Sequence, residues 1–100
     1  MQAIRVRYTV KAEFVAQNRE NIAAVMAELR AKGDVGCKYT SFVEPDGKTF
    51  VHVVVARDEA TLGIVPTLDA FKAFQAALRP NLEVPPQTEH WDVVGSSYDP

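Results

Sequence analysis

The stretch that decides the fold of this chain is CKYTSFVEPDGKTFVHVVVAR, residues 37–57. Two runs rich in β-branched and aromatic residues flank the tetrapeptide Glu-Pro-Asp-Gly at residues 44–47. Proline at the second position and glycine at the fourth favour a type I turn followed by a glycine bulge. The stretch is therefore predicted to be a β-hairpin in which Glu44 pairs with Lys48.

This turn sets a predicted register for the hairpin, with Phe42 opposite Phe50 and Thr40 opposite His52. Residues directly opposite each other in an antiparallel pair lie on the same face of the sheet. The four residues are therefore predicted to share one face. The other face is predicted to carry Cys37, Tyr39, Ser41 and Val43 with Val51, Val53 and Val55. Both faces are substantially apolar, which is typical of a sheet covered on both sides.

The rest of the chain supplies two more strands and two helices. Alternating apolar residues predict strands over residues 4–10 and 88–94, the second one following Pro85-Pro86. Apolar residues at helical spacing predict a helix over residues 19–32, with Asn18 as its N-cap. A second helix is predicted between Thr67, its cap, and Arg79-Pro80. A short turn over residues 59–62, capped by Asp58, precedes it.

The predicted order of elements is strand, helix, strand, strand, helix, strand. This is the split βαβ, or ferredoxin-like, arrangement of an α+β fold, with two helices on one face of a four-stranded antiparallel sheet. We expect a single domain over residues 1–100, with residues 96–100 as a frayed tail. Two helices cover only one face of the sheet. A large exposed apolar surface usually marks an interface, so we expect a homodimer whose two sheets meet face to face.

Composition narrows the class of protein. Hydrophobic residues make up 47% of the chain, charged residues 24%, and the formal net charge is −2. These values are ordinary for a globular protein, and the scattered basic residues argue against binding to nucleic acid. No apolar run is long enough to span a bilayer, and the N-terminus has no apolar signal segment. We therefore expect a cytoplasmic protein that does not bind membranes.

His52 is the most informative titratable residue, because three valines surround it within a strand. A neutral imidazole in an apolar cavity can act as a general base. Tyr8 and Tyr39 can donate a hydrogen bond to a substrate oxygen, and Phe74 and Trp91 can form an aromatic wall for a planar ligand. The alternative for each is a structural role in the core or at an interface.

Other types of site lack support in the sequence. The two histidines, His52 and His90, have no cysteine or carboxylate at the spacing of a metal site. No glycine-rich phosphate loop or nucleotide-binding fingerprint is present. No metal and no cofactor are therefore expected.

The chain resembles the dimeric α/β-barrel superfamily, and within it the antibiotic-biosynthesis-monooxygenase domain group. The residues that carry the resemblance are VRYTVK at 6–11, Gly36-Cys37, the segment from Phe50 to Leu62, and FKAF at 71–74. The resemblance implies a cofactor-independent, monooxygenase-like or isomerase-like activity on a small planar, mostly apolar substrate. It also implies a pocket between helices and sheet, lined by Thr40, Phe42, Phe50, His52, Val54 and Ala56. Composition alone favours the opposite face, with its three valines, as the one that the helices cover.

Three positions depart from the pattern of the superfamily. Many members carry Trp at the end of the third strand, where this chain has Ala56, and His a turn later, near Val65. The heme-degrading branch carries Asn in the first strand, where this chain has Val6. Heme degradation is therefore not expected. The alternative to an enzyme is a dimeric binding or interaction protein that kept the fold and lost the catalytic residues.

Overall fold

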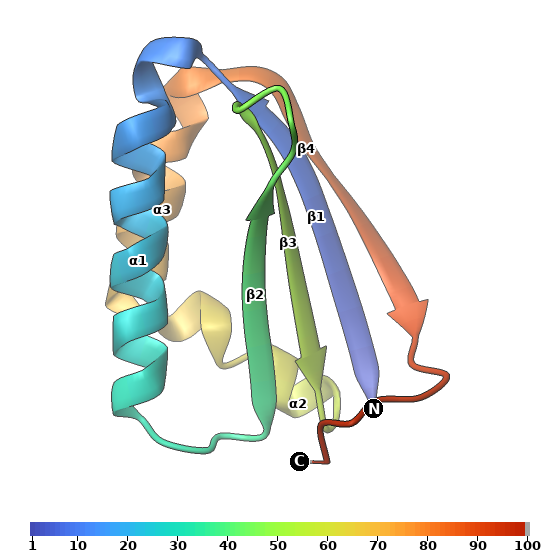
Figure 1. Ribbon diagram of the computed structural model, residues 1–100. Helices are drawn as coiled ribbons and strands as arrows, with labels where there is room; N and C mark the ends of the chain where they lie inside the picture. The colour runs from blue at the N-terminus through green and yellow to red at the C-terminus, as the bar shows by residue number, and fades with distance from the viewer. Residues whose placement is uncertain (100) are drawn as a thin grey trace.

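The computed structural model describes residues 1–99 and shows a four-stranded antiparallel sheet with helices packed on one side (Figure 1). The strands are β1 (Gln2–Val10), β2 (Cys37–Val43), β3 (Thr49–Ala56) and β4 (Leu82–Asp92). The helices are α1 (Val15–Ala31), α2 (Glu59–Leu62) and α3 (Asp69–Leu78). Single 3-10 turns lie at Ala12–Phe14, Val65–Thr67 and Arg79–Asn81. The strand order is β2-β3-β1-β4, which confirms the predicted α+β, ferredoxin-like fold.

The hairpin between β2 and β3 is present, but its predicted register is wrong by one residue. Val43 lies opposite Phe50, and Ser41 lies opposite His52. The turn is longer than predicted, because the Glu44 N–H donates to the carbonyl of Thr49, at 2.8 Å, and not to that of Lys48. A one-residue slip moves every side chain of a strand to the other face of the sheet.

Asp46 explains the longer turn. Its carboxylate accepts hydrogen bonds from the backbone N–H groups of Lys48, at 3.0 Å, and Thr49, at 2.8 Å. It also accepts a hydrogen bond from the Thr49 hydroxyl at 2.5 Å. Aspartate side chains commonly close turns in this way. These bonds hold Lys48 inside the turn and make Thr49 the first residue of β3.

The helix-covered face is the one that carries His52, as the resemblance implies and contrary to the indication from composition. The hydrophobic core between this face and the helices contains Tyr8, Val10, Val25, Phe50, Leu68 and Phe74, with Tyr39 packed against them. No helix within residues 1–99 covers the opposite face (Figure 1). On that open face Arg7 forms a bidentate ion pair with Glu44, and Arg5 pairs with Glu89 at 2.9 Å.

Helix α1 begins at Val15, four residues before the predicted start, because the 3-10 turn over Ala12–Phe14 leads directly into it. Asn18 is therefore an interior residue of the helix and not its N-cap. Its side chain is completely buried and donates a hydrogen bond to the Tyr8 hydroxyl oxygen at 3.0 Å. The predicted apolar stripe of α1 is confirmed, since Ile22, Val25 and Leu29 are buried.

The short helix α2 has Asp58 as its N-cap, as predicted, with the Thr61 N–H donating to the Asp58 carboxylate at 2.8 Å. Thr67 is not the cap of α3, because its hydroxyl donates to the carbonyl of Ile64. The cap comes from α1 instead. The Glu28 carboxylate accepts the Ala70 N–H at 2.8 Å and the Asp69 N–H at 3.3 Å.

Replacement of Glu28 by Ala is expected to lower the free energy of unfolding by about 1 kcal/mol. The substitution leaves two N–H groups at the start of α3 without their carboxylate acceptor and removes these hydrogen bonds between α1 and α3. Denaturant unfolding of the purified protein measures the change. The matched control is Glu20→Ala, at an exposed position of the same helix. Equal losses in the two variants would show that the cap contributes nothing.

Strand β4 begins at Leu82, six residues before the predicted start, and contains Pro85 and Pro86. Proline lacks the N–H that a central strand needs, but β4 lies at the edge of the sheet. The prolines also coincide with an irregularity in the pairing of β1 with β4, between Arg7 and Thr9. An edge position and a bulge together accommodate both prolines.

Residues 93–99 form no helix or strand, and Pro100, the last residue of the predicted tail, lies outside the described residues. No helix within residues 1–99 is long and apolar enough to cross a membrane.

Candidate functional site

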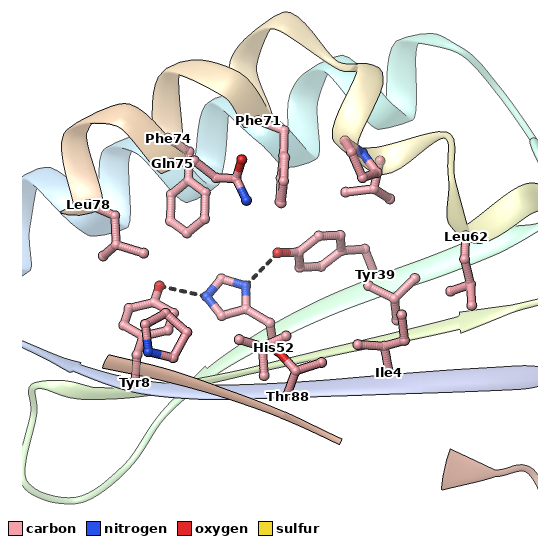
Figure 2. Close-up of a pocket in the computed structure, with 15 residues that line it drawn as sticks. Ile4, Tyr8, Tyr39, His52, Leu62, Phe71, Phe74, Gln75, Leu78 and Thr88 are labelled. Atoms are coloured by element: carbon pink, nitrogen blue, oxygen red, sulfur yellow. Dashed lines mark hydrogen bonds between the residues drawn. The ribbon is translucent and has the colours of Figure 1, made fainter. Parts of the chain in front are cut away.

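A cavity of about 240 Å³ lies between the sheet and the layer formed by α3 and the 3-10 turn before it. Figure 2 shows the side chains of Phe71, Phe74, Gln75 and Leu78 extending from α3 toward His52. None of the fifteen lining residues is charged. They are Ile4, Val6, Tyr8, Tyr39, His52, Val54, Leu62, Val65, Pro66, Phe71, Phe74, Gln75, Leu78, Pro86 and Thr88.

His52 lies between two tyrosine hydroxyl groups (Figure 2). Its Nε2 is 2.7 Å from the hydroxyl oxygen of Tyr8, and its Nδ1 is 2.6 Å from that of Tyr39. Three strands bring these residues together, because β1 carries Tyr8, β2 carries Tyr39 and β3 carries His52. Both ring nitrogens are engaged, so a ligand can bond to the imidazole only by displacing a tyrosine hydroxyl.

Asn18 extends this arrangement into the core. Its Nδ2 donates to the Tyr8 hydroxyl oxygen at 3.0 Å, while its Oδ1 is buried and has no hydrogen-bond partner within residues 1–99. The result is a chain of four side chains, Asn18–Tyr8–His52–Tyr39, which we call the relay. It runs from the buried start of α1 to the wall of the cavity.

Burial controls the protonation of the relay. It lowers the pKa of His52 to about 4, because the apolar surroundings disfavour an imidazolium. Burial also raises the pKa of both tyrosines well above their ordinary value. The hydrogen bond from Asn18 opposes part of this rise in the pKa of Tyr8. At neutral pH the site therefore holds a neutral imidazole between two protonated phenols.

Several of the predicted site residues meet in the structure. Tyr8, His52 and Phe74 line the cavity, with the ring centroids of Phe74 and His52 5.6 Å apart. Phe50 lies on the same face but behind the cavity wall, stacked on Tyr8 at 5.7 Å between ring centroids. Phe50 therefore supports Tyr8 and does not line the cavity.

The prediction that Thr40, Phe42 and Trp91 line this cavity is wrong. The shifted register places Thr40 opposite Val53 and Phe42 opposite Val51, on the open face of the sheet. Trp91 also lies on that face, with the Arg5 guanidinium 5.8 Å from its ring centroid. Phe42 and Trp91 remain 54% and 46% exposed, respectively.

Two members of the relay lie where the sequence does not predict them. The predicted register puts Tyr39 on the open face. The sequence signal for the correct register is the Asp46-Gly47-Lys48-Thr49 segment, in which Asp46 can close a longer turn. The predicted helix start makes Asn18 a cap. An asparagine one helical turn after the buried Phe14 is a weak signal for a core position.

The three positions at which the resemblance implies other residues are apolar and mostly buried. Val6 and Val65 line the cavity, whereas Ala56 is completely buried and does not line it.

Within residues 1–99, no three His, Cys, Asp or Glu side chains lie close enough together to hold a metal ion.

Comparison with known proteins establishes the fold. No protein-family model matches the chain, and no curated protein matches it. Among solved structures, an antibiotic biosynthesis monooxygenase is 18% identical, with 95% of this chain and 100% of that chain covered and a TM-score of 0.82. SnoaB, a cofactor-independent oxygenase from Streptomyces nogalater solved as a mutant protein, is 17% identical, with coverage of 98% and 97% and a TM-score of 0.73.

A third similar structure adds no functional information. NE2512 from Nitrosomonas europaea, a protein of unknown function, is 19% identical, with 99% of this chain and 94% of that chain covered and a TM-score of 0.80. The predicted structural resemblance to antibiotic-biosynthesis-monooxygenase-like proteins is thus confirmed, and at these identities the likeness concerns the fold.

Proposed function

We propose that the protein is a cofactor-independent, monooxygenase-like enzyme that acts on a small planar, mostly apolar substrate in the cavity beneath α3. The observation that carries the proposal is the neutral His52 held between two tyrosine hydroxyls in an uncharged cavity. The similarity in fold to a cofactor-independent oxygenase supports it.

The shape and lining of the cavity support this class of substrate. Its volume of about 240 Å³ is below the roughly 300–1,000 Å³ of sites for drug-sized ligands, which favours a compact molecule. Phe71 and Phe74, whose ring centroids are 5.7 Å apart, offer aromatic surface to a flat ring system. Tyr39 and Gln75 supply the polar groups that orient it.

The proposed reaction needs dioxygen as co-substrate and takes its electrons from the organic substrate. A methylene group next to an enol or phenol system becomes a carbonyl group. Two C–H bonds break, one oxygen atom forms the new C=O bond, and the other leaves as water with the two hydrogens. The substrate enters in its electron-rich ionised form, having already lost its acidic proton to solvent. Tyr39, with His52 behind it, stabilises the substrate oxygen on which that charge develops.

Oxygen uptake tests the proposal directly. Purified protein without added cofactor is mixed with planar enols and phenols, and oxygen consumption and products are recorded. We expect turnover of at least one such compound, and we expect His52→Ala to abolish it, because that variant removes both hydrogen bonds of the imidazole. Full activity in a folded His52→Ala protein would remove His52 from the mechanism.

A second candidate is a binding protein of the same fold without catalysis. Val6, Val65 and Ala56 favour it, because all three stand where members of the superfamily carry reactive or aromatic side chains. Saturable binding of planar ligands, with no oxygen consumed in the presence of any of these ligands, would support this candidate over the enzyme.

We also propose that a second copy of the chain covers the open face of the sheet. The exposed side chains of Phe42 and Trp91 lie there, together with the partly buried Val51, Val53 and Val55. Exposed aromatic side chains gathered with valines on one face are typical of a protein interface.

Replacement of Phe42 by Lys is therefore expected to convert a dimer into a monomer at micromolar concentration, because it places a charge in the proposed interface. Sedimentation equilibrium measures the mass. The control is Ala73→Lys, at an exposed position of α3, which is expected to stay dimeric. A wild-type protein that sediments as a monomer would contradict the proposal.

A further inference from the structure

We infer that the relay Asn18–Tyr8–His52–Tyr39 is polarised toward the cavity, so that Tyr39 donates its hydroxyl hydrogen to a ligand oxygen that only accepts. Such an oxygen belongs to a ketone, an enolate or a phenolate. The inference rests on the proposed function in one respect, namely that the cavity is the ligand site. The direction of the hydrogen bonds is argued from the contacts and burial of these four side chains and does not depend on turnover.

The direction is set at the buried end of the relay. The Asn18 Nδ2 donates to the Tyr8 oxygen, and the Tyr8 side chain is only 1% exposed. The Tyr8 O–H therefore needs an acceptor inside the protein, and the Nε2 of His52 at 2.7 Å is the one within reach. The Asn18 amide is oriented with its nitrogen toward Tyr8, so its Oδ1 accepts no hydrogen bond from the described residues.

The imidazole tautomer then fixes the direction of the hydrogen bond between His52 and Tyr39. A neutral imidazole carries one N–H and one bare nitrogen, so an Nε2 that accepts from Tyr8 places the hydrogen on Nδ1. The Nδ1–H donates to the Tyr39 oxygen at 2.6 Å. The Tyr39 O–H has no other described partner, and Tyr39 lines the cavity. It is therefore free to donate to a ligand.

The reverse direction is disfavoured by the same contacts. If the hydrogen were on Nε2, that N–H would donate to Tyr8, and the buried Tyr8 O–H would have no acceptor. Both tyrosines line the cavity, but Tyr8 is only 1% exposed whereas Tyr39 is partly exposed, so water or a ligand has better access to the Tyr39 hydroxyl. An unsatisfied hydroxyl is therefore more costly at Tyr8 than at Tyr39. Successive donors that point the same way also strengthen one another, which makes Tyr39 a better donor than an isolated phenol.

The proton position on His52 tests the direction without any substrate. His90→Gln leaves His52 as the single histidine of the chain, and side-chain nitrogen NMR then reports which ring nitrogen carries hydrogen. We expect a neutral ring with hydrogen on Nδ1. Hydrogen on Nε2 in this protein would overturn the inference.

Two variants at the buried end sharpen the test. Asn18→Asp offers Tyr8 an acceptor, so the hydrogen is expected to move to Nε2, whereas Asn18→Leu offers none and is expected to keep it on Nδ1. The control is Gln17→Glu, which adds the same charge at an exposed neighbouring position and is expected to change nothing. A tautomer that is the same in the folded Asp and Leu variants would contradict the inference. If the Asp variant does not fold, the wild-type tautomer decides.

Ligand binding tests whether the Tyr39 hydroxyl donates to a ligand oxygen. The probes are indanone, a flat bicyclic ketone, and indane, the matching hydrocarbon without oxygen. Tyr39→Phe is expected to weaken the binding of indanone about five- to tenfold and to leave that of indane unchanged. Equal affinity for the two probes in the wild-type protein, or no binding of indanone, would count against the inference. Absence of oxygen uptake would end the oxygenase proposal and leave both of these results standing, because neither requires turnover.

Discussion

Replacement of Tyr39 by Phe is expected to lower kcat/KM for the oxygen-dependent reaction by about a hundredfold or more. The substitution removes the one hydroxyl donor that the relay directs at the substrate oxygen, and loss of a single donor of this kind commonly costs about 10²–10³ in rate. The phenyl ring keeps the packing of β2 against the core. Steady-state oxygen uptake with the best substrate measures the effect, and most of the loss should appear in kcat.

The third tyrosine of the chain provides the matched control. Tyr98 lies away from the cavity, with the Lys38 ammonium 6.0 Å from its ring centroid. Tyr98→Phe makes the same chemical change and is expected to leave kcat/KM as it is. If Tyr39→Phe retains wild-type activity while binding substrate normally, the hydroxyl has no role in the transition state.

The stability of the protein is expected to fall by about 2 kcal/mol between about pH 7.5 and pH 5 because of His52. The folded-state pKa is about 4, below the ordinary value of about 6.5. Between these values the unfolded chain binds a proton at His52 that the folded protein does not, so protonation favours unfolding. This contribution is complete above about pH 6.5 and is lost as the pH falls toward about 4. Urea unfolding at the two pH values measures it.

His52→Gln is the comparison that isolates this effect. Glutamine keeps one donor and one acceptor between the two tyrosines but does not titrate, so its stability is expected to change much less over this range. His90→Gln, at an exposed position, is expected to behave as wild type. The carboxylate of Asp46 has a pKa lowered to about 2 by hydrogen bonds from Thr49 and Lys48, so it loses its contribution at lower pH. Equal acid sensitivity of wild type and His52→Gln would contradict the prediction.

The order of elements and the fold were predictable because they depend on periodicity, which the local sequence carries. The stripe of α1 and the cap of α2 at Asp58 are local features of this kind. The register of the hairpin was not predictable from the turn type, because Glu-Pro-Asp-Gly is compatible with two turn lengths. The choice depends on how many backbone N–H groups the Asp46 side chain binds, which is a property of the folded turn.

The candidate site was predictable in its centre and not in its surroundings. His52 stood out because a histidine within a run of valines is unusual, and Tyr8 follows from the alternation in the first strand. Tyr39 depends on the register, and Asn18 depends on where α1 begins. The Glu28 cap joins residues 41 positions apart in sequence, and no local pattern indicates such a contact.

Pro85 and Pro86 have a consequence for how the sheet meets other molecules. An edge strand with free N–H groups is a template on which another chain can add a strand and begin to aggregate. Neither proline has an N–H, so this part of β4 cannot extend the sheet sideways. The prolines thus prevent the addition of a strand at this part of one sheet edge, and they favour association through the face of the sheet.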